Sequence, residues 1–502
     1  MSDRPTILFV ALIQWDYSPF RSSSYGLGVS YALLSHKYAI PALVAWLREN
    51  SCEGHYVWIG DNEKEDVLEV LKAIDELKPD AVGFSLCTDE MISNYGIIRE
   101  LKESHPSLPV IVGGPHVSAL PEHTLRNFPL IDYVAIGEGE RTLTELLSRL
   151  ASGQKTAEMR EVSGLGFRDE AGEIAITSPR ERIRDINILP NPAYDLLLGP
   201  KTGANQGSLL PIVFSYGCPF FCTFCAADHG HYRFIDPGRA VDRIEWAVRE
   251  FGVDYFAFCD SFWPPSAKWL DEFCEKSEAS GLKVKFHFET RVGVHSLEQL
   301  QRLRRIGATA VAVGVESGDP EMLKSIKKGI TPDMARRTFA ALHAAGLFSR
   351  GFFMFGNRGE NRETIAASVK LMNELNPSVV TISTYRPLPG TEDFDLLAED
   401  EKDWWMKGNE KGRWWAGGEV PSICDLSPTE LLLLAREAEL RFPLRWGYLR
   451  RNVIDGNLPR EFRRVCRAVF TLGLRKVALG TAERYAIFRA LIAGMKSIAK
   501  RR

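Results

Sequence analysis

Short apolar runs alternate along the chain with segments in which apolar residues recur every three or four positions. The first run, Thr6 to Leu12 (TILFVAL), is typical of a parallel strand that is buried on both faces. The alternation continues to residue 150 and predicts strands at 6–12, 55–60, 80–86, 108–112 and 132–136, with helices at 41–49, 64–77, 91–103 and 140–150. This order predicts a doubly wound parallel sheet of the α/β class, which binds ligands beyond the carboxyl ends of its strands.

A second series of strands and helices begins at Pro211. The pattern predicts strands at 211–214, 254–259, 283–289, 309–315, 349–355 and 378–384, with helices at 240–250, 266–280, 296–306, 333–345 and 362–375. Six strand-helix units are enough for an open, partial barrel and too few for a closed barrel of eight. Polar side chains at the carboxyl ends of such strands are the candidates for chemistry.

The segments outside these two series are predicted as a connector and a helical region. A short hairpin around Asp169–Gly172 and several prolines mark the connector, and Ser427-Pro-Thr-Glu430 is a capping box that opens a helix to about Arg441. The long stretch 13–37 is rich in Ser, Tyr and Gly, as functional or disordered loops are. We expect four regions: a Rossmann-like domain at 1–152, the connector at 153–208, the partial barrel at 209–395 and a mainly helical domain at 396–502.

Composition indicates a soluble, globular, cytoplasmic protein. Of its 502 residues 45% are hydrophobic and 25% charged, and no apolar run approaches the roughly 20 residues of a membrane span. Nine cysteines in so long a chain are no disulfide framework. The net charge of −3 hides a basic tail, because residues 441–502 hold 16 Lys and Arg against three acidic residues. This amphipathic tail predicts peripheral contact with a membrane or an anionic partner, with a solvated helical bundle as the alternative. We expect no nucleic-acid partner.

Three of the cysteines stand together directly after the apolar run that begins the second series. Cys218, Cys222 and Cys225 are separated by three and then two residues. Thiolates are the ligands that hold iron-sulfur clusters, and three ligands without a nearby fourth leave one iron open. The alternatives are three unrelated thiols or a structural metal knuckle, although neither His229 nor His231 continues a familiar zinc spacing.

The spacing Cys-x-x-x-Cys-x-x-Cys, with the aromatic Phe224 before the last cysteine, resembles the radical S-adenosylmethionine (SAM) superfamily. This resemblance implies that the three cysteines hold a 4Fe-4S cluster, whose open iron chelates SAM, and that backbone near Phe224 meets the adenine. The strand ends that match the family's pattern imply four further SAM contacts, namely Glu289, Arg291, Glu316 and Ser317. The alternative is that Glu289 and Arg291 merely pair with each other.

The loops after the strands of the first series resemble the cobalamin-binding domain of B12-dependent radical SAM enzymes. The loops contain Gly113-Gly-Pro-His116 and Gly137-Glu138, and glycine lets backbone approach a large flat ligand. The residues implied to contact cobalamin are Ser85, Thr88, Gly113, Gly114, Pro115, His116, Gly137 and Glu138. The Asp-x-His-x-x-Gly motif is absent from this segment, so we expect base-off cobalamin with no protein histidine on cobalt. The alternative for His116 is a hydrogen bond within its loop.

Together these resemblances, which cover roughly residues 5 to 395, imply a cobalamin-dependent radical SAM methyltransferase. In this class a 5′-deoxyadenosyl radical abstracts a substrate hydrogen, and methylcobalamin then gives its methyl group to an unactivated carbon. No general base is required, and we assign no catalytic side chain. The alternative within the class is non-methylating chemistry, such as oxidative cyclisation or ring rearrangement. The expected partners are a flavodoxin or ferredoxin as electron donor and a small-molecule or lipid-like substrate. The basic tail and the tryptophans at 404, 405, 414 and 415 favour a lipid-like substrate, and the alternative for the tryptophans is that they pack the C-terminal domain onto the barrel.

Overall fold

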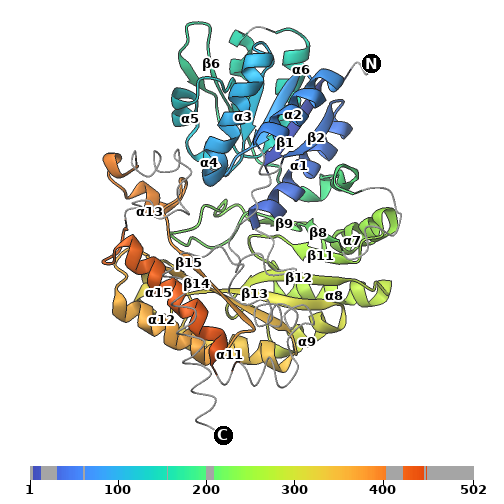
Figure 1. Ribbon diagram of the computed structural model, residues 1–502. Coiled ribbons are helices and arrows are strands. Elements are labelled where there is room, and N and C mark those ends of the chain that lie inside the picture. Colours follow the sequence, from blue (N-terminus) through green and yellow to red (C-terminus); the bar gives the residue numbers. More distant parts are fainter. Residues whose placement is uncertain are drawn as a thin grey trace. The chain divides into compact units, whose positions relative to one another are not determined.

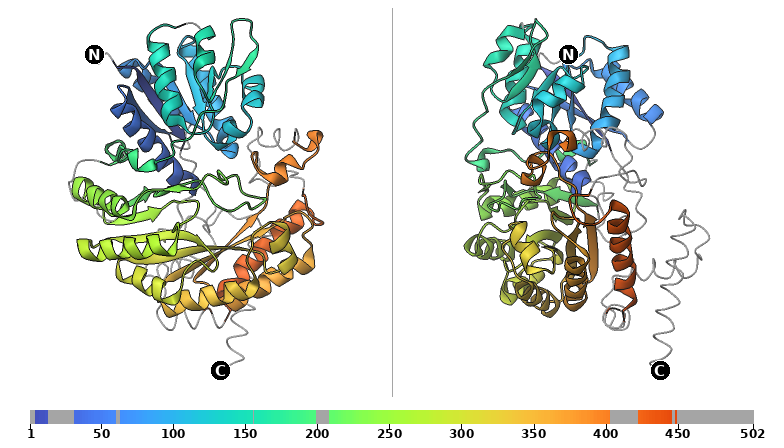
Figure 2. Two further views of the ribbon diagram at one scale, coloured as in Figure 1. Left: turned by 180° about the vertical axis from the view of Figure 1, so that it is seen from behind. Right: turned by 90° about the vertical axis from the view of Figure 1, so that its left-hand side faces the viewer.

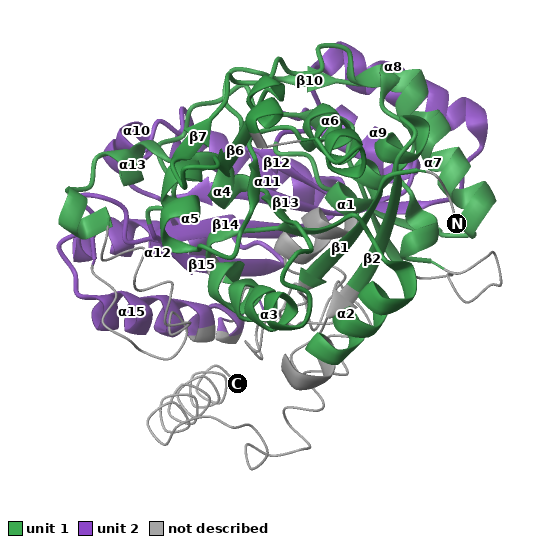
Figure 3. Cartoon of the chain, turned by 90° about the horizontal axis from the view of Figure 1, so that it is seen from above, with its two compact units in different colours: residues 1–17, 30–261, 387–420 green, residues 18–29, 262–386, 421–502 purple. Residues whose placement is uncertain are grey.

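The computed structural model describes residues 4–12, 31–59, 63–154, 156–198, 208–402, 422–445 and 448. Most of the predicted loop at 13–37, the four tryptophans between 404 and 415 and almost all of the basic tail lie outside these residues. The chain divides into two compact units (Figure 3). The first contains the described residues up to Ser261 together with 387–402, and the second contains 262–386 and the described residues from 422 onwards.

The first unit is built around a seven-stranded sheet in the order β2-β1-β3-β4-β5-β6-β7. Its strands are β1 (Thr6–Leu12), β2 (Glu53–Ile59), β3 (Ala81–Ser85), β4 (Val110–Gly113), β5 (Tyr133–Ala135), β6 (Leu165–Arg168) and β7 (Ile174–Ile176). The first five strands pair in parallel, which confirms the predicted doubly wound sheet. The hairpin predicted around Asp169–Gly172 is β6 and β7, and it extends this sheet in antiparallel fashion beside β5.

Helices cover both faces of this sheet (Figure 1). The helical segments are α1 (Tyr31–Glu49), α2 (Glu63–Leu77), η1 (Thr88–Glu90), α3 (Met91–Ser104), α4 (Pro115–Ala119), α5 (Pro121–Asn127), α6 (Gly139–Ala151) and η2 (Thr156–Glu161). Successive β1 side chains point to opposite faces. Ile7 and Phe9 pack in the core with residues of α1 and α6, whereas Leu8 and Val10 pack with residues of α2 and α3. Both faces of β1 are therefore buried, which explains its uninterrupted apolar sequence.

The rest of the first unit carries the cysteine loop. Its elements are η3 (Ile186–Ile188), η4 (Tyr194–Leu196), β8 (Leu209–Ile212), β9 (Ser215–Tyr216), β10 (Arg233–Phe234), α7 (Pro237–Phe251), β11 (Tyr255–Phe258) and α13 (Glu392–Asp395). Strand β8 pairs with β11 in parallel, and β9 pairs with β10 antiparallel. The cysteines lie in the segment that connects β9 to β10.

The second unit contains four parallel strands and the helices that follow them. The strands are β12 (Lys285–Arg291), β13 (Ala308–Glu316), β14 (Phe348–Phe355) and β15 (Val379–Thr384). The helices are α8 (Ala267–Ser280), α9 (Leu297–Arg305), α10 (Pro320–Ser325), α11 (Pro332–Ala344), α12 (Arg362–Leu375), α15 (Pro428–Arg441) and η5 (Phe442–Leu444). Helices α9, α11 and α12 pack on these strands (Figures 1 and 2). Together with β8 and β11, the second series of strands has six members among the described residues, the number that the sequence predicted.

Side-chain caps fix where several helices of this unit begin. Ser296, Thr331 and Asn361 each accept a hydrogen bond from a backbone N–H in the first turn of the helix that follows. The predicted capping box at Ser427 is present, and its helix α15 ends at Arg441 as expected. In the part of the chain that the structure describes, we find no helix that is both long and apolar enough to cross a membrane.

Candidate cofactor sites

The cysteine loop is a compact turn with its own hydrogen bonds. Cys218 N–H donates to the carbonyl of Asp228 (3.0 Å), and Cys225 N–H donates to the carbonyl of Cys222 (3.2 Å). Gly217 precedes the first cysteine with φ +78°, and a Cβ there would lie 2.6 Å from the carbonyl oxygen of His231. Only glycine tolerates both the left-handed backbone and this close approach. The local sequence therefore folds the loop tightly just where the thiols are presented.

A distant segment of the same unit also holds this loop. Thr223 Oγ1 donates to Asp393 Oδ2 (3.0 Å), and the N–H of Asp393 donates to the carbonyl of Thr223 (3.3 Å). Asp393 lies in α13, whose N-cap is Thr391, the last residue of a Pro-Leu-Pro-Gly-Thr motif. This motif thus supports the cysteine loop through α13.

The three thiols of this loop are suitable ligands for an iron-sulfur cluster. Cys218 and Cys222 are buried and Cys225 is half-buried. Among the described residues, no three His, Cys, Asp or Glu side chains converge as ligands of one ion. An iron-sulfur cluster makes no such demand, because its cysteines bind separate irons. The donor set of this loop therefore fits a cluster held by three cysteines. Phe224 lies half-buried on the same loop.

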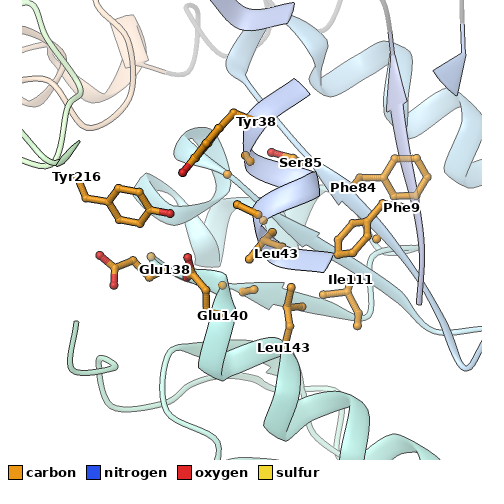
Figure 4. Close-up of a pocket in the computed structure, with 18 of the residues that line it drawn as sticks. Phe9, Tyr38, Leu43, Phe84, Ser85, Ile111, Glu138, Glu140, Leu143 and Tyr216 are labelled. Carbon is orange, nitrogen blue, oxygen red and sulfur yellow. The ribbon is translucent and has the colours of Figure 1, made fainter. Parts of the chain in front are cut away.

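A cavity of about 310 Å³ lies in the first unit, at the carboxyl ends of β3, β4 and β5 (Figure 4). Its apolar wall includes Phe9, Leu43, Phe84, Ile111 and Leu143, and its polar groups include Tyr38, Glu140 and Tyr216. Five of the eight residues predicted to contact cobalamin line it, namely Ser85, Gly113, Gly114, Gly137 and Glu138. The other three, Thr88, Pro115 and His116, are not among the lining residues.

Two glycines shape this cavity in different ways. Gly114 has φ +103°, and a Cβ there would lie 2.7 Å from the carbonyl oxygen of Leu86. Gly137 has φ +80°, and a Cβ there would meet no heavy atom within 4 Å. Gly114 is thus required by the packing of the chain, whereas Gly137 borders open space. A cradle of this kind fits a large flat cofactor that approaches the backbone closely.

His116 lies in the protein interior, on α4. Its Nδ1 lies 3.0 Å from Thr88 Oγ1, within hydrogen-bond distance. Burial lowers the pKa of His116 to about 4, and the nearby His123 adds to this effect. The imidazole is therefore neutral at physiological pH. The loop hydrogen bond that the sequence left as an alternative for His116 is present, and it brings together two predicted residues, Thr88 and His116.

The two glutamates of the cavity have different environments. Glu138 accepts hydrogen bonds from the guanidinium of Arg233 through Oε1 and from the N–H of Ile183 through Oε2 (3.1 Å). Glu140 is buried, and its burial raises its pKa to about 7 against the effects of backbone hydrogen bonding, Arg233 and the Tyr216 hydroxyl. Sequence reasoning assigned no role to Glu140, Tyr38 or Tyr216. Glu140 and Tyr216 each stand beside a predicted motif, which is the only local signal for them.

The predicted SAM contacts lie in the second unit, at the ends of β12 and β13. Glu289 and Arg291 are two residues apart on β12, so their side chains project from the same face of the strand. Burial raises the pKa of Glu289; the positive charge of Arg350 opposes this rise, and the carboxylate of Glu316 adds to it. A Cβ on Gly329 would lie 3.3 Å from Arg291 Nη2. The structure therefore collects charged groups of both signs at these strand ends.

Glu316 is held by a partner that sequence reasoning missed. Lys328 Nζ donates to Glu316 Oε1 (2.8 Å), and the two side chains are only 10% and 12% exposed. Glu316 has φ +66°, and a Cβ on Gly314 would lie 2.5 Å from its Oε1, so the carboxylate folds back over the glycine. Ser317 is buried, and its Oγ lies 3.1 Å from the Oγ of Ser368. The same Ser317 Oγ accepts a hydrogen bond from the N–H of Asp319.

A buried glutamate organises the turn after β14. Glu360 Oε2 accepts hydrogen bonds from the N–H groups of Gly356 and Asn357 (3.0 Å to Asn357). Burial raises the pKa of Glu360 to about 7, although these hydrogen bonds oppose the rise. The sequence analysis did not single out Glu360, the glutamate that holds this strand end.

Two family models match the chain, each over one series of strands. The B12 binding domain matches residues 26–147, which hold most of the cavity wall, and the radical SAM superfamily matches residues 212–372, which hold the cysteine loop. These families imply cobalamin for the first region and a 4Fe-4S cluster with SAM for the second.

Curated relatives and solved structures agree with both matches. An uncharacterized methyltransferase of Pyrococcus horikoshii is 30% identical over 70% of this chain and 77% of its own length. The anaerobic magnesium-protoporphyrin IX monomethyl ester cyclase of Rubrivivax gelatinosus is 28% identical over 72% of this chain and 66% of its own length. The structure of the radical SAM methyltransferase TsrM from Kitasatospora setae shares the fold, with a TM-score of 0.60, 20% identity and coverage of 77% of this chain and 74% of that chain. The chain belongs to the cobalamin-dependent radical SAM enzymes.

Proposed function

We propose that the protein is a methyltransferase that acts on an unactivated carbon. The observation that carries this proposal is that one compact unit contains both the cysteine loop and the glycine-lined cavity, with Tyr216 in the cavity wall two residues before Cys218. The relative named as a methyltransferase supports the same chemistry. When bound, the cluster and SAM supply a 5′-deoxyadenosyl radical that takes a substrate hydrogen, and cobalamin supplies the methyl group.

The side chains of the chain itself bind and orient these groups. We propose that Cys218, Cys222 and Cys225 bind three irons, with backbone near Phe224 against the adenine. The planar guanidinium of Arg291 suits the carboxylate of SAM, and Glu289 and Glu316 suit its ammonium or hydroxyl groups. Ser317, whose hydroxyl lies within hydrogen-bond distance of Ser368, contributes by fixing the turn that presents Glu316. No general base is needed because the substrate hydrogen leaves as an atom.

For cobalamin, we propose binding in the base-off form without a histidine on cobalt. The cavity has a largely apolar interior with a few polar groups, among them Tyr38, Glu140 and Tyr216, which suits a flat aromatic base that carries ring nitrogens (Figure 4). Gly137 leaves open space for close approach, and the hydrogen bond of His116 to Thr88 occupies one of its nitrogens. We propose Ser85, Gly113, Gly114 and Gly137 as cobalamin contacts, with Pro115, His116, Thr88 and Glu138 supporting them.

The test is the ratio of two products of SAM in the fully loaded enzyme. Under anaerobic conditions with a reductant and a substrate that is consumed, methyl transfer forms S-adenosylhomocysteine and 5′-deoxyadenosine in step with methylated product. The second candidate function is oxidative cyclisation, which the relative from Rubrivivax gelatinosus favours. Product that forms with 5′-deoxyadenosine and no S-adenosylhomocysteine would exclude methyl transfer.

Two proposals on partners depend on the sequence. The basic composition of residues 441–502 supports contact with an anionic lipid surface and, with it, a lipid-like substrate. Deleting residues 443–502 is expected to abolish sedimentation with anionic vesicles, and unchanged sedimentation would contradict this proposal. Electron supply by a flavodoxin or ferredoxin remains a proposal that reduction assays with each protein would test.

A further inference from the structure

Strand β9 forms part of the cavity lining and leads directly into the cysteine loop. Tyr216 lines the cavity and is a residue of β9, and Cys218 follows two residues later. Strand β9 pairs with β10, so that Arg233 lies opposite Tyr216. The guanidinium carbon of Arg233 is 5.7 Å from the centroid of the Tyr216 ring. Whatever holds Arg233 in place therefore also positions Tyr216 and the start of the cysteine loop.

Arg233 is held by the cavity itself. It forms an ion pair with Glu138, which stands between the two cavity glycines Gly137 and Gly139, and the two side chains are 13% and 20% exposed. Arg233 Nη1 also donates to the carbonyl of Ile183 (2.5 Å), whose N–H donates to Glu138. Removing one partner of an ion pair this well buried costs more free energy than removing one partner of a surface pair.

A second contact fixes the far side of the loop. Arg182 forms two hydrogen bonds of 2.8 Å with the carboxylate of Asp228. The carbonyl of Asp228 accepts from Cys218 N–H, and the carbonyl of Cys218 accepts from Gly230 N–H (3.1 Å). Arg182 and Ile183 are adjacent in the chain, so one short segment holds the cysteine loop at Asp228 and the cavity at Glu138.

From this arrangement we infer that binding in the cavity and binding at the cysteine loop are energetically coupled through Arg233 and Glu138, so that cobalamin and the iron-sulfur cluster each strengthen the binding of the other. The inference rests on the proposed function, which places the two cofactors at these sites. Reciprocity follows from thermodynamic linkage, because an effect of one ligand on the affinity of the other works equally in both directions. Couplings of this kind change affinity by about five-fold or more.

The experiment compares cobalamin affinity in two states of the full-length protein. The dissociation constant of cobalamin is measured anaerobically by absorbance titration, first with iron-free protein and then with protein reconstituted with iron and sulfide. We expect the cluster-loaded protein to bind cobalamin at least about five-fold more tightly. Binding of both cofactors with equal affinities for cobalamin in the two states would overturn the inference alone. Failure of either cofactor to bind would overturn the proposed function as well.

Two variants and a matched control locate the coupling. Arg233→Lys keeps the positive charge but removes the planar guanidinium, which donates to Glu138 and to the carbonyl of Ile183 at the same time. Glu138→Gln keeps an acceptor for the N–H of Ile183 but removes the ion pair. Both variants are expected to bring the ratio of affinities close to one. The control is Arg180→Lys, because Arg180 is 12% exposed and forms a forked pair with Glu145 in the same unit, away from the cavity lining. A ratio that stays at the wild-type value in both variants would overturn the assignment.

A measurement on the unmodified chain guards against variants that fail to fold. In iron-free protein, cobalamin is expected to slow amide hydrogen exchange in peptides spanning 214–235, where Cys218 N–H is bonded to Asp228. Peptides of the β6–β7 hairpin serve as the internal reference. If saturation with cobalamin left amide exchange across 214–235 unchanged, the proposed coupling between the cavity and the cysteine loop would be contradicted.

Discussion

Lys328 and Glu316 form an ion pair of 2.8 Å at the end of β13, and almost nothing of either side chain reaches solvent. Glu316 Oε1 lies over Gly314, so that the pair closes against the backbone of its own strand. Charges at such depth are tolerated when they are paired, and removing one partner leaves the other without compensation. The pair therefore supports the fold at the site where we propose that SAM binds.

The first prediction concerns this pair. Lys328→Met leaves the carboxylate of Glu316 unpaired, and we expect it to lower the free energy of unfolding by about 3 kcal/mol. Chemical denaturation followed by circular dichroism would measure the loss. Lys324→Met is the control, since Lys324 pairs with Glu321 at 3.9 Å with both side chains more than 80% exposed, and it should cost less than about 0.5 kcal/mol. Equal losses in the two variants would show that the buried pair has no special importance.

The second prediction concerns the cluster. Replacing Cys218, Cys222 or Cys225 with serine should reduce the iron content after reconstitution from about four atoms per chain to less than about one. Cys274→Ser on α8 is the matched control, because Cys274 is buried and its burial raises the pKa of its thiol to about 12. Iron and sulfide analysis of the repurified proteins would decide. Retention of a full cluster in any of the three variants would remove that cysteine from the ligand set.

The third prediction separates backbone strain from contact with cobalamin. Gly137 and Gly172 have φ values of +80° and +83°, and a Cβ at either would meet no heavy atom within 4 Å. Alanine at either position should therefore cost about 1 kcal/mol of stability. Only Gly137 lines the cavity, so only Gly137→Ala should weaken cobalamin binding, by about ten-fold. Absorbance titration would measure this, and an equal loss in Gly172→Ala would refute the contact.

The fourth prediction is a dependence of stability on pH. The pKa of Glu360 rises from its ordinary value of 4.5 to about 7 in the folded protein, so the folded state holds this proton more tightly than the unfolded state does. Its stabilising contribution is complete below about pH 4.5 and is lost as the pH rises through about 7, by up to roughly 3 kcal/mol. Glu360→Gln keeps the acceptor for Gly356 and Asn357 and cannot ionise.

The measurement is the difference in unfolding free energy between the wild-type protein and Glu360→Gln from pH 5 to pH 8. We expect the free energy of unfolding of the variant to increase relative to that of the wild-type protein as the pH rises. Glu321→Gln, which removes one charge at an exposed position, controls for net charge. A difference that does not change with pH would show that Glu360 ionises alike in both states.

Local patterns predicted most of the elements for reasons that the structure makes clear. Strand β1 was visible because helices bury both its faces, and α12 was predicted with its observed bounds because Asn361 caps it and Asn376 ends it in the left-handed conformation. The cysteines and the cavity glycines could be recognised from the sequence because their roles depend on residues that stand only a few positions apart in the chain. The B12 and radical SAM assignments followed from them.

Long-range pairs could not be predicted in the same way. Glu138 and Arg233 are 95 positions apart, and no sequence pattern around either residue predicts that the two pair. In the sequence, Lys328 after its helix cannot be distinguished from a surface lysine. Only the structure shows that it donates a hydrogen bond to the carboxylate of Glu316. The addition of β6 and β7 to the sheet depends on pairing with β5, for which a hairpin sequence gives no partner.

The hydrogen bonds between Thr223 and Asp393 impose an order on biosynthesis. The two residues are 170 positions apart, and the strands β12 to β15 are encoded between them. A ribosome must therefore translate all four strands before the cysteine loop can acquire its last support. A nascent chain released earlier would present the thiols on an incompletely held loop. The cysteine loop therefore acquires its complete set of hydrogen bonds only after synthesis has passed residue 393.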